Sequence, residues 1–79
     1  MVFPSSAYTN LTTSVAEYFA RRTLKSAGFE TSEWIPLARY TNENAIVITF
    51  HHAEERFRIL RVTVELEPNS RIVCTVNPQ

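Results

Sequence analysis

The stretch that decides the fold spans residues 56–67 and reads RFRILRVTVELE. Apolar and polar residues alternate along residues 60–67, and a pleated strand sends alternate side chains to opposite faces. The apolar residues of one face are Leu60, Val62, Val64 and Leu66, and the polar residues of the other face are Arg61, Thr63, Glu65 and Glu67. We therefore predict a β-strand with one face in the protein core and the other in solvent.

Phe57 and Ile59 do not follow this alternation, because their parity places them on the polar face of the strand. Two interpretations are open. A β-bulge near Ile59 and Leu60 would turn both side chains toward the core. Without a bulge, the two residues form an apolar patch on the solvent face, which would be a candidate binding surface.

The length and composition are those of one small globular domain. The chain has 79 residues, of which 44% are hydrophobic and 20% charged, and this balance excludes a disordered or low-complexity chain. A domain of this size buries only about 60–65% of the surface that its unfolded chain exposes. We predict a single domain over residues 1–79 with a thin core.

The sequence shows no targeting or membrane-spanning segment. No window approaches the roughly 18 consecutive apolar residues of a membrane span. The N-terminus lacks the basic segment and apolar run of a secretory signal. We therefore expect a cytoplasmic protein without a membrane partner.

The charges balance, and cysteine is scarce. Eight basic residues, seven of them Arg, match eight acidic ones, which argues against the strongly basic surface of a dedicated nucleic-acid binder. Cys74 is the only cysteine, so neither an intramolecular disulfide nor a zinc site built from cysteines can form within one chain. We expect a fold held by packing, with no metal and no cofactor.

The N-terminal third predicts an arm and a helix. Residues 1–10 mix Pro, Ser, Thr and Asn with a few apolar residues, which is typical of an extended arm. Within residues 11–27, Ser14 and Glu17 have the spacing of a capping box, and Asn10 or Thr12 would start the helix earlier. Apolar residues recur at helical spacing and define one core-facing side.

The end of this helix is marked by Gly28, the only glycine. A helix that ends at Ala27 needs a left-handed residue at the next position, and glycine adopts that conformation without strain. Leu24 and Phe29 are then the pair that makes the hydrophobic contact of a Schellman motif. We predict a positive φ at Gly28.

Four strands are expected after the helix, over residues 34–40, 45–52, 56–67 and 71–77. Pro36 cannot donate to a sheet ladder, so the first of these strands belongs at an edge. Short turns join the strands and make neighbours antiparallel. The predicted fold class is α+β, with one N-terminal helix packed on a four-stranded antiparallel β-meander (α-β-β-β-β). The residues expected in the core are Val15, Phe19, Ile46, Ile48, Phe50, Val62, Val64, Ile72, Cys74 and Val76.

Reactive residues are few and do not form a catalytic pattern. His51 and His52 are adjacent on a strand, so their side chains point to opposite faces and cannot chelate one ion; Glu54 or Glu55 would join His52 only at the start of a turn. Cys74 has inward parity and is interpreted as a small hydrophobe. The chain has no glycine-rich loop or nucleophile elbow. We predict no catalytic residues and no enzymatic activity.

The outward parity of the sheet supplies the candidate binding residues, which are Val47, His51, Arg56, Phe57, Ile59, Arg61 and Val73. Aromatic residues and Arg are enriched at the hot spots of protein interfaces. The same residue types also stack unpaired bases on RNA-binding sheets. A third interpretation is plain surface, because β-branched residues favour strands on either face.

The expected function is a small, non-enzymatic protein–protein interaction module, an adaptor, regulator or inhibitor of a larger partner, with self-association to a homodimer included. The alternative is a single-stranded RNA- or DNA-binding domain that uses Phe57 with Arg56, Arg58 and Arg61. The two differ in their response to salt, because neutralising phosphates makes nucleic-acid affinity fall steeply as salt rises.

Overall fold

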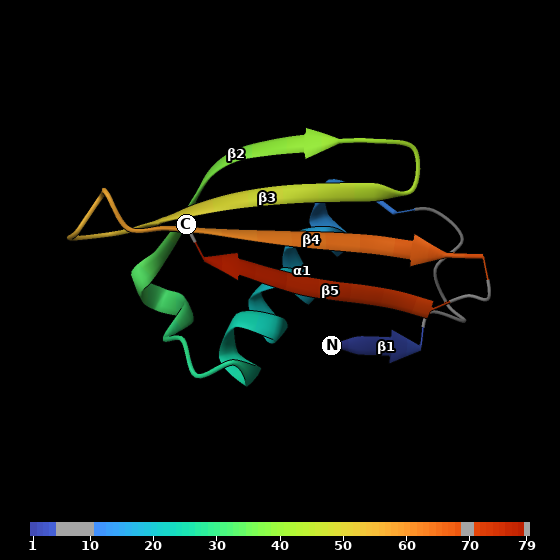
Figure 1. Ribbon diagram of the computed structural model, residues 1–79, viewed down its shortest axis with the longest axis horizontal. Helices are drawn as coiled ribbons and strands as arrows, with labels where there is room; N and C mark the ends of the chain where they lie inside the picture. The colour runs from blue at the N-terminus through green and yellow to red at the C-terminus, as the bar shows by residue number, and fades with distance from the viewer. Residues whose placement is uncertain (5–10, 69–70, 79) are drawn as a thin grey trace.

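The chain folds into one helix packed across one face of a five-stranded antiparallel sheet (Figure 1). The computed structural model describes residues 1–4, 11–68 and 71–78. The elements in chain order are β1 Val2–Pro4, α1 Thr13–Ser26, the 3-10 turn η1 Thr31–Glu33, β2 Trp34–Thr41, β3 Ala45–His52, β4 Ile59–Glu67 and β5 Arg71–Pro78. The α+β prediction is confirmed, and β2 to β5 form the expected meander.

The fifth strand is β1, which pairs antiparallel with β5 and makes the strand order β1-β5-β4-β3-β2. Val2 pairs with Val73, and Phe3 pairs with Ile72. Phe3 is buried, and its ring lies 4.7 Å from that of Phe19. Residues 2–4 of the expected arm are therefore a strand of the sheet, whereas residues 5–10 lie outside the described residues.

The strand that was predicted over residues 56–67 is shorter in the structure, because β4 begins at Ile59 and not at residue 56. Residues 53–58 form the connection from β3, in which the Arg58 amide donates to the Glu55 carbonyl at 2.9 Å. The register from His51↔Ile59 to Ala45↔Glu65 is unbroken, so the proposed bulge near Ile59 and Leu60 is absent from this strand pair. The sheet's irregularity lies in β2, between Pro36 and Ala38.

The start of α1 differs from the predicted capping box. Thr12 is the N-cap, and its hydroxyl oxygen accepts a hydrogen bond from the Val15 amide at 3.2 Å. The pairing of Ser14 with Glu17 was therefore wrong, and the alternative start at Thr12 is the one adopted. The Glu17 carboxylate instead pairs with the Arg39 guanidinium of β2 at 2.8 Å. This ion pair joins the helix to the edge strand.

The end of α1 is the predicted Schellman motif. Gly28 has φ +91°, its amide donates to the Lys25 carbonyl at 3.1 Å, and the Phe29 amide donates to the Leu24 carbonyl at 2.9 Å. Both hydrogen bonds are those of the motif. Leu24 is buried, and Phe29 packs against the core.

The core lies between α1 and the inner face of the sheet. Ala16 and Ala20 are fully buried, and their small side chains let the helix lie close to the strands. Eight of the ten predicted core residues are buried, whereas Val15 and Val76 are half-buried at its margin. The prediction missed Phe3 and Trp34, which are also buried. Within the described residues, no helix combines the length and apolar character that crossing a membrane requires.

Candidate interaction surface

One whole face of the sheet is left uncovered by the described elements. In Figure 1, α1 lies behind the strands, and no described helix or strand lies in front of them. We call this side the open face. Its residues are those that alternate with the core residues, and the residues paired across neighbouring strands share it. The five-stranded sheet therefore has one side packed against α1 and one side that no described helix or strand covers.

Five of the seven predicted binding residues lie on the open face. They are Val47 and His51 of β3, Ile59 and Arg61 of β4, and Val73 of β5. His51 pairs with Ile59, which confirms that Ile59 points away from the core. Arg61 is exposed, and the other four side chains are half-buried by their neighbours in the sheet.

Arg56 and Phe57 are placed differently from the prediction. They lie in the connection before β4 and not on the strand, because the turn after His52 extends to Arg58. Phe57 is 81% exposed, the highest exposure among the large hydrophobic residues described. These two residues therefore lie beyond the strand end of the open face.

Three binding candidates escaped the prediction, all of them apolar or aromatic residues of β2. Ile35 is 43% exposed, Leu37 60% and Tyr40 68%. Ile35 pairs with His51 and Tyr40 pairs with Val47, so both extend the open face to its edge. Leu37 is the extra residue at the irregularity between Pro36 and Ala38. This irregularity interrupts the alternation that would have revealed them.

A shallow hollow of about 280 Å³ lies where these residues meet, lined by Leu37, His51 and Arg56. The structure thus brings two predicted residues together with one that was missed. The Nδ1 atom of His51 lies 3.0 Å from the carbonyl oxygen of His52. Because a carbonyl oxygen only accepts, this hydrogen bond requires the proton on Nδ1. The hollow combines an apolar wall with a guanidinium and an imidazole, which suits a side chain with a polar end.

Charges on the open face are mixed in sign. Arg61 and Glu65 lie on β4, the central strand, with Thr63 between them. Arg61 and Glu65 are exposed, and neither has an ion pair in the described part of the chain. A bound surface could supply partners for both charges.

His52 lies on the opposite face and has a structural role. It is buried, and its Nδ1 accepts hydrogen bonds from the amides of Glu54 and Glu55 at 3.3 and 3.1 Å. Its ring packs edge-on against Trp34. Glu54 and Glu55 thus contact His52 through backbone amides, and the described residues contain no group of three or more His, Cys, Asp or Glu that could hold a metal ion.

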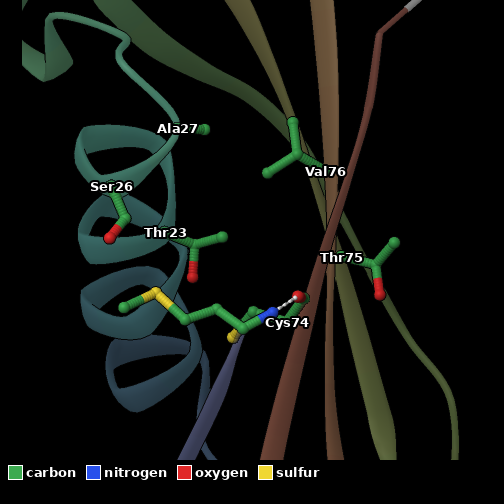
Figure 2. Close-up of a pocket in the computed structure, with 7 residues that line it drawn as sticks. Thr23, Ser26, Ala27, Cys74, Thr75 and Val76 are labelled. Atoms are coloured by element: carbon green, nitrogen blue, oxygen red, sulfur yellow. Dashed lines mark hydrogen bonds between the residues drawn. The ribbon is translucent and has the colours of Figure 1, made fainter.

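A second pocket, of about 460 Å³, lies between α1 and β5 beside the N-terminus (Figure 2). Thr23 and Val76 point into it, whereas Thr75 points away from the helix. The Met1 ammonium donates to the Cys74 carbonyl at 2.6 Å. Burial raises the pKa of the Cys74 thiol, and a hydrogen bond with Thr23 and the N-terminal charge only partly offset this effect. The thiol is therefore protonated at neutral pH and is a poor nucleophile.

Comparisons with protein-family models, with curated proteins and with solved structures found no match.

Proposed function

We propose that the chain is a non-enzymatic protein-interaction module, an adaptor, regulator or inhibitor, that binds its partner through the open face. The observation that carries the proposal is the uncovered apolar area of this face. Ile35, Leu37 and Tyr40 expose large side chains beside the half-buried Val47 and Ile59. A small monomer seldom leaves such an area in water unless the area has a use.

The residue types at the margin of this area support a protein partner. Protein interfaces combine an apolar centre with a polar rim, and they are enriched in Tyr, Phe and Arg. Here Tyr40 and Phe57 are exposed aromatic residues, and Arg56 and Arg61 are exposed cations. These residue types are therefore those that protein interfaces favour.

The distribution of charge favours a protein over a nucleic acid. Neutralising a phosphate backbone requires several cations along one surface. The open face instead carries Glu65 on its central strand, and the whole chain has equal numbers of basic and acidic residues. Phe57 with Arg56 and Arg58, in the connection at one end of the sheet, would form only a short stacking site.

The experiment compares the proteins that are captured by three tagged chains: the wild type, a double variant and a control variant. The lysate also contains the untagged chain, so that capture of a second copy is measured. The variant Leu37→Ser with Tyr40→Ser removes apolar surface from the open face. The matched control is Tyr18→Ser, which removes a 53% exposed aromatic ring from α1. Quantitative mass spectrometry, with and without nuclease, measures the proteins that each chain retains.

We expect the wild type and the Tyr18→Ser control to capture the same proteins and the double variant to lose them. All three proteins should melt at similar temperatures, because the substituted side chains are exposed. Equal capture by the double variant would contradict the proposal. Capture that disappears with nuclease would favour the nucleic-acid alternative.

The proposal includes a cytoplasmic location. Structural disulfides are typical of oxidising compartments, whereas the only cysteine here is a free, buried thiol. This observation supports a reducing environment.

A further inference from the structure

We infer that the occupant of the open face is a second copy of this chain, packed sheet against sheet about a two-fold axis that passes over Thr63 of β4. The axis lies in the interface plane and is perpendicular to the strands. This inference rests on the proposed function and adds the identity of the partner. It is carried by the order of charges and apolar residues along the open face.

The rows of paired residues define the geometry. Thr63 lies on the central strand and pairs with Val47 on one side and Thr75 on the other, and Val47 pairs in turn with Tyr40. We call Tyr40, Val47, Thr63 and Thr75 the middle row. The next row of the open face toward the β3–β4 connection contains Arg61, and the next row in the opposite direction contains Glu65.

The two charges flank the middle row symmetrically. Each is two residues from Thr63, which is about 6.6 Å along a strand. Arg61 and Glu65 are thus about 13 Å apart within one copy, too far to pair with each other. A two-fold axis through the middle row reverses the strand direction and places Arg61 of each copy over Glu65 of the other. The dimer therefore supplies both missing ion-pair partners.

The charges also exclude the other simple arrangement. A two-fold axis parallel to the strands would keep each row at its own level. It would place Arg61 over Arg61 and Glu65 over Glu65, and like charges in contact across an interface destabilise it. The perpendicular axis alone converts two unpaired charges into two equivalent ion pairs.

The same axis matches apolar surface with apolar surface. It keeps each strand over its own copy, so Tyr40 and Val47 meet Tyr40 and Val47 of the second copy. This self-matching is what an isologous interface requires. Packed sheets lie about 10 Å apart and are rotated by about 30° because each sheet is twisted. The short side chains of Thr63 and Thr75 permit close approach at the centre.

The size of the face predicts a weak dimer. Four strands of eight or nine residues at about 4.8 Å spacing and about 3.3 Å rise cover roughly 500 Å² of flat area per copy. Stable complexes bury about 1,200–2,000 Å² in total. Two such faces would bury roughly 1,000 Å² in total, which is below that range, so association should need micromolar or higher concentrations.

A charge-swap cycle in sedimentation velocity tests the inference on the full chain, over about 5 μM to about 1 mM at low salt. The proteins are the wild type, Arg61→Glu, Glu65→Arg and the variant with both substitutions. The matched control combines Arg61→Glu with Glu54→Arg. It restores the net charge of the chain, but the new positive charge lies in the β3–β4 connection and not at position 65. Glu54 is exposed, and its side chain has no ion pair among the described residues. Thermal melts verify that every variant is folded.

We expect each single reversal to raise the dimer dissociation constant at least about tenfold, because it places like charges across the interface. The double swap should restore it to within about threefold of wild type, because it re-forms both pairs. The Glu54 control should remain weakened. This pattern would support the two-fold axis through Thr63.

Three results would overturn the inference: a wild type that stays monomeric throughout, a dimer that neither single reversal weakens, or equal rescue by the swap and the control. The failure of the dimer can be distinguished from the failure of the proposed function. If the wild type is monomeric but captures a different protein, and Leu37→Ser with Tyr40→Ser abolishes that capture, the dimer is refuted and the proposed function stands. If that double variant changes neither capture nor self-association, both proposals fail.

Discussion

At the scale of single residues, the two adjacent histidines show how strand parity separates two roles. His51 contributes to the hollow of the open face, and His52 is buried beneath Trp34 on the other side. His52 acts through its Nδ1 atom, which accepts two backbone hydrogen bonds and closes the turn into β4. The position of Phe57 outside the sheet follows from this turn.

Replacing His52 by Phe should lower the free energy of unfolding by about 1–3 kcal/mol, because two amides lose their acceptor while the ring volume against Trp34 is kept. Urea titration measures the effect. The matched substitution His51→Phe should change stability much less, since the His51 side chain is half-exposed on the open face. Equal losses for the two variants would refute the special role of His52.

Cys74 should react slowly with thiol reagents. Its raised pKa leaves less thiolate at any given pH, and the thiol is 2% exposed. We expect alkylation by iodoacetamide at pH 8 to be at least about tenfold slower in the native protein than in urea.

The raised pKa of the Cys74 thiol also predicts that stability depends on pH. Because the thiol pKa is higher in the folded than in the unfolded state, its contribution to stability is fully present below the ordinary value of 9.0. This contribution is lost as the pH rises through the folded-state pKa. Equally fast alkylation of native and unfolded protein would contradict both expectations.

At the scale of elements, the helix stop depends on one residue. Gly28→Ala should destabilise the fold by roughly 1 kcal/mol, because a Cβ in the left-handed region is strained. A Cβ at this position would meet nothing within 4 Å, so the loss is conformational and not steric. Gly28→Asn is the matched control, since Asn tolerates the left-handed region better. Equal stability of the Ala variant and the wild type would show that the helix end does not need glycine.

The start of β4 provides a test of which face its residues occupy. Phe57→Ser with Ile59→Thr should change the free energy of unfolding by less than about 1 kcal/mol, because no core volume is removed. Leu60→Ala, one residue further along, should cost about 2–5 kcal/mol, since Leu60 is 3% exposed. A large loss in the double variant would place Phe57 or Ile59 in the core.

Most elements could be predicted from local signals, and each failure has its own physical cause. The local signals are the alternation along residues 45–52 and 59–67 and the single glycine after α1. β1 was missed because three residues are too few to show a period. Residues 53–55 were expected to connect the two strands, but residues 56–58 were assigned to the strand that follows them. The connection extends to Arg58, and the Glu54 and Glu55 amides within it are hydrogen-bonded to His52. The apolar residues of β2 were hidden because Pro36 and the extra Leu37 disrupt the period.

At the scale of the whole molecule, the helix covers one side of the sheet and leaves the other without described cover. Ile35, Leu37 and Tyr40 lie outside the core and support the proposed binding role. The charges of β4 support the proposal that the partner is a second copy. Dimer formation should weaken as salt rises, because salt screens the attraction between Arg61 and Glu65 as two copies approach each other.

The most direct measurement follows methyl chemical shifts by NMR as the protein is concentrated from about 10 μM to about 1 mM. Neighbouring residues of β4 point to opposite faces, so the strand carries its own control. We predict that the methyl signals of Val47 and Thr63, on the open face, shift with concentration. Those of Val62 and Val64, which are buried beneath α1, should stay in place. Shifts that are confined to α1, or no shifts at all, would contradict self-association through the open face.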